Sequence, residues 1–237
     1  MLWQEDKKAE PYKVPDTVAD LLYKVSAVQV PLDHAQELSD AILEILPWIA
    51  DEEHAGIHMI HGASTGNGWQ RPEDDCGEAC IYLSKRSKTP LRIPKTRFED
   101  AKALTGKTIE LGGNKVTFGD YQIKTFSPLQ TLFSRYVIVG DNETEDEFVG
   151  RVSEEMKAMG ITLRKALCGM GHTFDMANGP VKTMSIMLAD LDPEEAVAVQ
   201  TNGIGEGRKA GFGLFMPHKG IKPVGDMSEN THFDGTS

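Results

Sequence analysis

The spacing of apolar residues in the first half of the chain predicts an alternation of strands and helices. Residues 19–30 are rich in apolar and β-branched side chains, which is typical of a strand, and Pro31 interrupts this run. Apolar positions then recur at helical spacing, which predicts a helix over about residues 34–46. Asp33 is expected to be its N-cap, with Gln36 as the capping-box partner at the third helical position.

The rest of the first half is predicted to contain one more helix and several short strands. Pro94 begins the expected helix, which covers 95–104, because proline fits the first turn of a helix. Gly112 and Gly113 favour a hairpin turn. The expected strands are 55–61, 80–85, 89–93, the two arms of a hairpin over 107–119, and 121–126.

The second half repeats this order of elements. The expected helices are 143–159 and 194–202, and the expected strands are 135–139, 161–169, 180–191 and 211–216. The middle two strands are expected to pair around a glycine-rich turn. Both halves fit a β-α-β-β-α-β pattern, which predicts an α+β protein with two tandem ferredoxin-like domains. The expected domains are 1–130 and 131–223, followed by a flexible tail over 224–237.

The bulk composition is that of a globular protein, with 237 residues of which 40% are apolar and 26% are charged. No apolar run approaches the ~20 residues of a membrane helix, and the first residues lack the pattern of a secretory signal. Three cysteines are an odd number, so a reducing, cytoplasmic location without a membrane partner is expected. Cys76 and Cys80 lack a second ligand pair at zinc-site spacing, and we expect neither metal nor cofactor.

The net charge of −11 speaks against a nucleic-acid partner, but the charges are unevenly distributed. Residues 1–80 hold 5 basic and 16 acidic side chains, whereas residues 81–135 hold 11 basic and 4 acidic ones. A basic segment inside an acidic chain can form a binding stripe. Its alternative is a solvated surface with uneven charge, and charge alone does not separate the two.

The most specific segment is a glycine-rich stretch over 203–213, which reads GIGEGRKAGFG. Glycine has no Cβ, so its backbone amides can approach a ligand closely. Such amides together with Arg208 and Lys209 are suited to binding phosphate. The stretch follows a helix and leads into a strand, which excludes a dinucleotide fingerprint, and it lacks the Gly-Lys-Ser/Thr of a Walker loop. A purely structural loop stays open as an alternative.

The doubled glycine-apolar-glycine pattern with its basic spacer resembles the C-terminal glycine-rich loop of repeat-associated CRISPR proteins. The likeness extends over most of residues 2–222 through the stretches LWQEDKK, VPLDHA, IHGASTGNGW, RKALCGMGHT and GFGLFMPHKGI. On these stretches the chain resembles the pre-crRNA-processing endoribonuclease, the sixth Cas family, in its MYXAN subtype. The resemblance implies two ferredoxin-like domains with RNA lying on their cleft face.

The resemblance also implies a reaction that needs no metal ion. The ribose 2′-hydroxyl attacks the adjacent phosphate and leaves a 2′,3′-cyclic phosphate and a 5′-hydroxyl. This reaction uses a base at the 2′-oxygen, an acid at the leaving oxygen and positive groups around the phosphate. The implied substrate is CRISPR repeat RNA, the precursor of the guide crRNA. The implied protein partners are other subunits of the crRNA effector complex.

His34 is the leading catalytic candidate among the seven histidines. It lies at the expected start of the first helix, where the helix end attracts phosphate and disfavours a protonated imidazole. The resemblance places the catalytic histidine of the family at the same point. Tyr23 and Ser26 on the preceding strand are candidates to assist it. The alternative is an ordinary polar residue in the first turn of a helix.

RNA contacts are expected from the glycine-rich stretch, from the residues after it and from the basic segment. His218 is also a candidate acid, and His172, in the expected glycine-rich turn, is a further candidate contact. The predicted RNA-binding residues are Gly203, Gly205, Gly207, Arg208, Lys209, Gly211, Gly213, His218, Lys219, Arg86, Lys88 and Arg92.

Two functions therefore follow from the sequence. The first is an endoribonuclease that cleaves each repeat and stays bound to its product. The second is a non-catalytic subunit that caps the repeat end of the crRNA, and only a working His34 separates the two. A third alternative is an unrelated double ferredoxin-like protein that binds a small ligand, which repeat-RNA binding would exclude.

Overall fold

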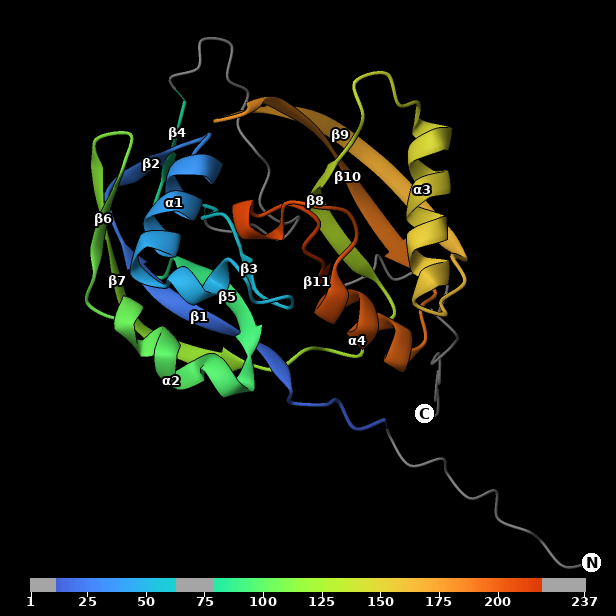
Figure 1. Cartoon of the computed structure of the whole chain (residues 1–237), viewed down its shortest axis with the longest axis horizontal. Helices are drawn as coiled ribbons and strands as arrows, with labels where there is room; N and C mark the ends of the chain where they lie inside the picture. The colour runs from blue at the N-terminus through green and yellow to red at the C-terminus, as the bar shows by residue number, and fades with distance from the viewer. Residues whose placement is uncertain (1–11, 63–78, 219–237) are drawn as a thin grey trace, which may run out of the picture.

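The computed structural model describes residues 12–62 and 79–218, which form two main sheets with helices packed against them and a small two-stranded sheet (Figure 1). The first half contains β1 (Val18–Ser26), β2 (Gln29–Pro31), α1 (Ala35–Ile45), β3 (Gly56–Ile57), β4 (Cys80–Tyr82), β5 (Lys88–Pro94), α2 (Phe98–Ala101), β6 (Thr108–Leu111) and β7 (Asn114–Lys124). The second half contains β8 (Leu132–Ile138), α3 (Glu145–Ala158), β9 (Lys165–Met176), β10 (Gly179–Ala189), α4 (Pro193–Asn202) and β11 (Met216–Pro217).

Each main sheet has the strand order of a ferredoxin-like fold. The order is β3-β5-β1-β7-β6 in the first half and β11-β8-β10-β9 in the second, with every neighbouring pair antiparallel. The predicted α+β class with two ferredoxin-like units is therefore confirmed. The proposed boundary at residue 130 falls between β7 and β8 and stays a prediction. The predicted tail lies outside the described residues.

Each half has an apolar core between its sheet and its helices. α1 buries Leu38 and Ile42, which are four residues apart and so face the first sheet together. α3 buries Phe148, Val152 and Met156 against the second sheet by the same spacing. None of the helices in the described ranges is long and apolar enough to span a bilayer.

The start of α1 differs from the prediction by one residue. His34, not Asp33, is the N-cap residue of α1, and its side chain makes no capping hydrogen bond. The carboxylate of Asp33 instead lies 3.0 Å from Nε2 of His172 in the second half. The Asp33 side chain, which the local sequence predicts to cap the helix, therefore makes a tertiary contact instead.

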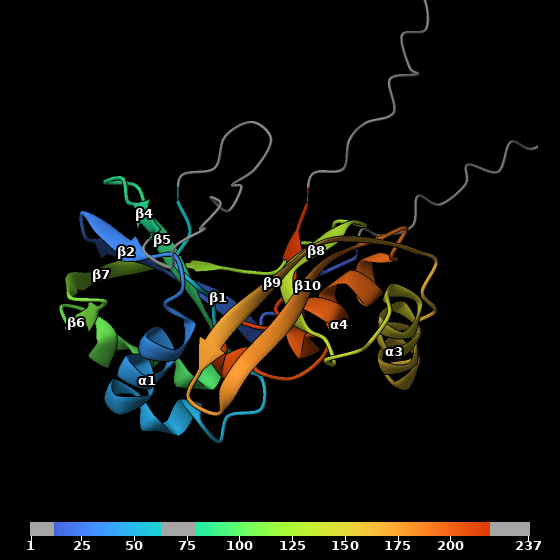
Figure 2. The same cartoon turned by 90° about the horizontal axis from the view of Figure 1, so that it is seen from above.

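The predicted turn around Gly169 and Gly171 is wrong. β9 continues through both glycines to Met176, and the turn to β10 follows it. A Cβ on Gly169 would lie 2.5 Å from Oγ of Ser185 on β10, so glycine here leaves room for the Ser185 hydroxyl. The β9–β10 hairpin extends towards α1 (Figure 2), and His172 of β9 lies 3.0 Å from Asp33, just before that helix.

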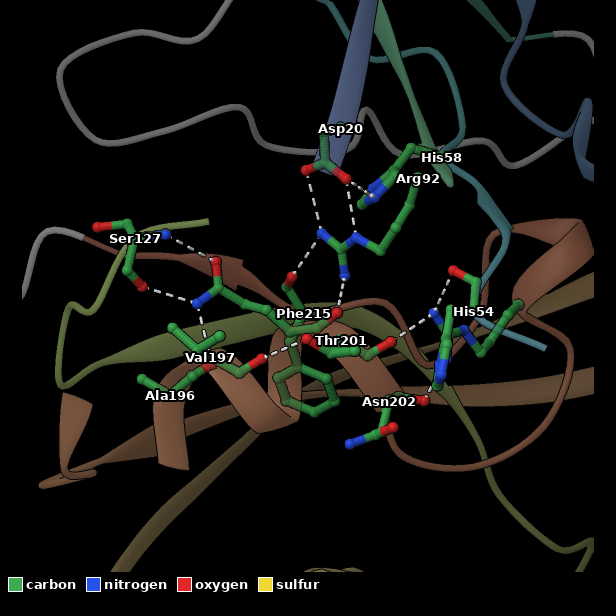
Figure 3. A network of polar contacts seen from close by, with 12 residues as sticks. Asp20, His54, His58, Arg92, Ser127, Ala196, Val197, Thr201, Asn202 and Phe215 are labelled. Carbon is green, nitrogen blue, oxygen red and sulfur yellow. Dashed lines mark hydrogen bonds and ion pairs between the residues drawn. The ribbon is translucent and has the colours of Figure 1, made fainter. Parts of the chain in front are cut away.

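Arg92 of β5 fastens the two halves together and is completely buried. It donates to the carbonyl oxygen of Gln200 at 2.6 Å and to that of Phe215 at 3.1 Å, both in the second half (Figure 3). Its guanidinium also lies 4.8 Å from the ring centre of Phe126, in the segment that joins the halves. This buried cation therefore helps to set the relative position of the two sheets.

The strands β3 and β11 are shorter than predicted. β3 covers only Gly56–Ile57 of the predicted 55–61, and β11 covers only Met216–Pro217 near the predicted 211–216. Some residues that were predicted to lie in these strands, Met59 and Phe212 among them, are instead buried in an apolar cluster between the halves. Packing between the halves has replaced strand pairing at both points.

Candidate functional site

The glycine-rich stretch forms a tight loop between α4 and β11. All five of its glycines have a positive φ, from 65° to 92°. A Cβ on Gly213 would lie 2.3 Å from the carbonyl oxygen of Ile204, and one on Gly203 would lie 2.5 Å from that of Gly213. Ile204 also donates its N–H to the Gly213 carbonyl oxygen at 3.1 Å. The two glycine-apolar-glycine units therefore pack backbone against backbone, which requires glycine.

Arg208 and Lys209 fasten this loop to the first half. Arg208 donates to the carbonyl oxygen of His54 at 3.1 Å, and Lys209 donates to that of Ala55 at 3.0 Å and to that of Glu52. Burial lowers the pKa of Arg208 to about 10 and the pKa of Lys209 to about 8. Both side chains are thus engaged within the protein, and their contact with RNA stays a prediction.

His34 is buried at the start of α1, with 2% of its surface exposed. Its Nδ1 lies 2.8 Å from the carbonyl oxygen of Pro31, and its Nε2 accepts from the N–H of Ile60 at 3.0 Å. A carbonyl only accepts and an amide only donates, so the ring is neutral with its proton on Nδ1. Catalysis by His34 therefore requires at least one of these bonds to break, and its catalytic role stays a prediction.

A cluster of aromatic and imidazole rings lies where the second sheet meets the start of α1. Tyr136 on β8 is central, and the rings of His61 and His172 both lie 6.3 Å from its ring. Phe174 stands edge-on to Tyr136 at 4.9 Å and reaches Phe212 of the glycine-rich loop at 5.2 Å. The cluster therefore ties β8, β9 and the glycine-rich loop to the first half.

His172 and Asp33 form a polar pair at the edge of this cluster. His172 Nε2 lies 3.0 Å from Asp33 Oδ1, and the two side chains are 26% and 40% exposed. The His172 ring stands edge-on to Phe174 at 4.5 Å. Thr183 Oγ1 on β10 donates to the His172 carbonyl oxygen at 2.9 Å. The pair is therefore fixed by packing and still open to solvent.

Tyr23 and Ser26 occupy different environments on β1. Tyr23 is completely buried, donates its hydroxyl to the carbonyl oxygen of Ala101 at 2.6 Å, and has its pKa raised by burial. Tyr23 therefore contributes to the core, and its assistance to catalysis stays a prediction. Ser26 is exposed at the end of β1, opposite Thr117 of β7, and its role stays a prediction.

The basic residues that were predicted to contact RNA differ in their exposure to solvent. No part of the Arg92 side chain is exposed, and its contact with RNA stays a prediction. Arg86 is exposed in the turn between β4 and β5, and Lys88 donates to Oε1 of Gln122 at 2.7 Å. Arg86 and Lys88 thus remain predicted contacts, whereas Lys219 lies outside the described residues.

His218 lies next to β11 and is partly buried. Its ring is 6.1 Å from that of Phe133 on β8, and the guanidinium of Arg135 lies 5.5 Å from the same ring. Phe133 alternates with Leu132, which faces the core, so these three side chains lie on the face of the sheet away from α3. The predicted RNA contact of His218 stays a prediction.

The sequence does not predict that Asp33 and His172 form a pair. They are 139 residues apart, and a turn assigned around His172 hides the fact that His172 and Phe174 share one face of a strand. Within residues 12–62 and 79–218, no group of three or more His, Cys, Asp or Glu side chains is arranged to hold a metal ion.

Comparison with known proteins gives a family match over nearly all of the described chain. A family model described as "Cas6 Crispr" matches residues 19–220. A relative from Myxococcus xanthus (strain DK1622), named "CRISPR-associated endonuclease Cas6", is 27% identical over 198 residues, which are 84% of this chain and 80% of the relative.

Solved structures share the fold at low sequence identity. A protein titled "An RAMP protein binding different RNA substrates" has a TM-score of 0.55 and 15% identity, covering 84% of this chain and 98% of that one. A Cas6-related protein from Pyrococcus furiosus has a TM-score of 0.53 and 13% identity, covering 84% and 97%. At these identities the likeness concerns the arrangement of the two sheets.

Proposed function

The chain belongs to the Cas6 family, as its sequence predicts, and on this premise we propose that it is an endoribonuclease that cleaves CRISPR repeat RNA. The family match over residues 19–220 carries the proposal, because it spans both sheets, the start of α1 and the glycine-rich loop. A relative named as an endonuclease and aligned along 84% of this chain supports the same activity.

The cleavage is proposed to need no metal ion and to proceed by attack of the 2′-hydroxyl on the adjacent phosphate. The products are a 2′,3′-cyclic phosphate and a 5′-hydroxyl. The start of α1 is the proposed site, because the N-terminal amides of an 11-residue helix bind phosphate. Asp33, His34 and His172 gather at that point, and imidazole transfers protons near neutral pH.

RNA binding is proposed to depend on local basic groups, since the chain as a whole carries a net charge of −11. Arg86 and Lys88 lie in and next to one turn of the first half and are the proposed phosphate contacts. The product is proposed to stay bound, with the protein acting as a subunit of the crRNA effector complex.

A second candidate function is a non-catalytic subunit that caps the repeat end of the crRNA. One observation favours it: both ring nitrogens of His34 are hydrogen-bonded to main-chain groups. A protein whose histidine serves only to hold the start of α1 could bind repeat RNA in the same site without cutting it.

The test uses purified full-length protein and the repeat RNA of its own locus in the presence of EDTA. A second RNA carries a 2′-deoxy nucleotide at the cut position. Cutting once per repeat in EDTA, with survival of the deoxy RNA, is the expected result. Tight binding of the repeat without any cleavage would establish the capping function instead, and cleavage that only a divalent ion restores would refute the metal-independent reaction.

A further inference from the structure

The Asp33–His172 pair combines features of a proton-transfer dyad. Asp33 immediately precedes the N-cap residue of α1, and His172 comes from β9 in the other half of the chain. Resting on the proposed function, we propose that His172 is the general acid of RNA cleavage and that Asp33 is its positioning residue. The dyad exists only when the two halves are packed together.

The geometry leaves one side of the imidazole for a ligand. Nε2 of His172 is directed to Asp33 Oδ1 at 3.0 Å, so Nδ1 is the nitrogen that can face a bound phosphate. A carboxylate on one ring nitrogen orients the imidazole and fixes a proton on that nitrogen, as in catalytic triads. The edge-on contact with Phe174 at 4.5 Å restricts the tilt of the ring.

The pair also lies beside the expected phosphate position. The β9–β10 hairpin touches the first turn of α1, where Oε1 of Gln36 accepts from the N–H of Ala177 at 3.2 Å. Asp33, which contacts His172, directly precedes the N-cap residue of α1, so a phosphate held by the first-turn amides of α1 would lie near the pair. His34 has no such freedom, because both of its nitrogens are bonded inside the protein.

The proposed step balances as follows. The 2′-oxygen forms a bond to phosphorus while its proton passes to solvent water. The bond from phosphorus to the 5′-oxygen breaks, and the proton on Nδ1 of His172 passes to that leaving oxygen. His172 ends neutral with its remaining proton on Nε2, held towards Asp33. Nothing is oxidised or reduced, and solvent reprotonates Nδ1 for the next cycle.

The experiment compares two repeat RNAs in single-turnover reactions, one with the natural 5′ leaving oxygen and one with sulfur in its place. A thiolate leaves without being protonated, so loss of a general acid slows only the oxygen RNA. The variants are His172→Ala, Asp33→Asn and a control, Thr173→Ala, whose exposed side chain lies next along β9 on the opposite face. Binding affinity and thermal unfolding are measured for each variant.

We expect His172→Ala to cut the oxygen RNA about 10²- to 10⁴-fold more slowly and the sulfur RNA within about 3-fold of the wild-type rate. Asp33→Asn should slow only the oxygen RNA and move the pH dependence of the rate. The titratable groups described next to the ring are Asp33 and Tyr136. Thr173→Ala should leave every value unchanged.

Three results overturn the dyad. The first is an unchanged rate for His172→Ala on the oxygen RNA, and the second is equal slowing on both RNAs. The third is an Asp33→Asn variant with the wild-type pH dependence, which removes Asp33 from the proposed role. If the wild-type protein binds both RNAs but cuts neither, the endoribonuclease function itself has failed, and that outcome is separate from the other three.

Discussion

Arg92 on β5 donates two hydrogen bonds to the carboxylate of Asp20 on β1, at 2.8 and 3.1 Å, with both side chains buried. Burial opposes the charge on Asp20, but the Arg92 guanidinium outweighs it and holds the pKa of Asp20 below its usual value. Because the same guanidinium reaches Gln200 and Phe215, this ion pair supports the contact between the first half of the chain and the α4–β11 region.

Replacing Arg92 is expected to destabilise the whole chain. Arg92→Met leaves the carboxylate of Asp20 buried without its main partner, which costs about 3–5 kcal/mol of unfolding free energy. Urea unfolding measures the loss. The control is Lys102→Met, which removes an exposed ion pair with Glu99 and should leave the free energy of unfolding nearly unchanged. Equal effects of the two variants would mean that Arg92 does not hold the halves together.

Acid should weaken the fold through His58, which lies 3.9 Å from Asp20. Burial, followed by the charge of Arg92, lowers the pKa of His58 to about 3. In the unfolded chain a histidine takes up a proton near pH 6.5, so this contribution to stability is complete above pH 6.5 and is lost as the pH falls towards 3. Asp20 adds a further loss only below about pH 4, since its folded pKa lies under 3.8.

The expected result is a loss of about 2 kcal/mol of unfolding free energy between pH 7 and pH 5 that depends on His58. Urea unfolding of the wild type and His58→Gln across this range isolates the term, because the other histidines are common to both proteins. Parallel pH curves for the two proteins would show that His58 takes up a proton in the folded state as readily as in the unfolded chain.

The sequence predicts the elements better than it predicts the faces of the strands. Helical spacing in α1 and the repeated order of elements are local patterns, and the structure confirms both. Tyr23 and Arg92 were assigned to the site although they are buried. A register shift between Tyr23 and Val25 disturbs the alternation of faces along β1. Asp20, the ion-pair partner of Arg92, lies 72 residues away from it. Neither fact is visible in a local window.

A single methyl group in the glycine-rich loop should be more harmful than its size suggests. Gly213→Ala places a Cβ 2.3 Å from the Ile204 carbonyl oxygen at a φ of 65°, and we expect a loss of about 3 kcal/mol or more. Gly160→Ala is the matched control, since its φ is 78° and nothing lies within 4 Å of the added Cβ. It should cost only about 1 kcal/mol, the penalty for left-handed backbone. Similar melting temperatures for the two variants would contradict the backbone packing described for the loop.

The salt dependence of repeat-RNA binding tests whether Arg86, which is exposed, and Lys209, which is bonded within the protein, contact phosphate. Arg86→Ala should reduce the slope of log affinity against log salt by about 0.7, the value for one contact with single-stranded phosphate. Lys209→Met should lower stability and leave that slope unchanged, because Lys209 donates to the carbonyl oxygens of Glu52 and Ala55. A reduced slope for Lys209→Met would show instead that Lys209 leaves these partners when RNA binds.

The candidate site was predictable only in part. The sequence directs attention to the start of α1, because the cap region, the histidine and the helix end are adjacent in the chain. It does not bring His172 to Asp33, since that contact depends on β9 continuing through Gly169 and Gly171 and on the two halves meeting. The sequence does not predict the contacts of Arg208 and Lys209 for the same reason. A basic pair in a loop does not reveal whether it faces a ligand or another part of the chain.

His34 can be tested by a substitution that keeps one of its two hydrogen bonds. Asparagine places an N–H donor where His34 has Nδ1, so His34→Asn can still donate to the Pro31 carbonyl oxygen but leaves the Ile60 N–H without its acceptor. Losing that buried bond should cost about 1–3 kcal/mol of unfolding free energy. If His34 positions the start of α1, cleavage at a temperature where the variant is folded should fall less than about 10-fold with the same pH dependence. A fall of 10²-fold or more in a folded variant would make His34 itself a proton-transfer group, because proton transfer at the reacting atoms contributes about 10²- to 10⁴-fold.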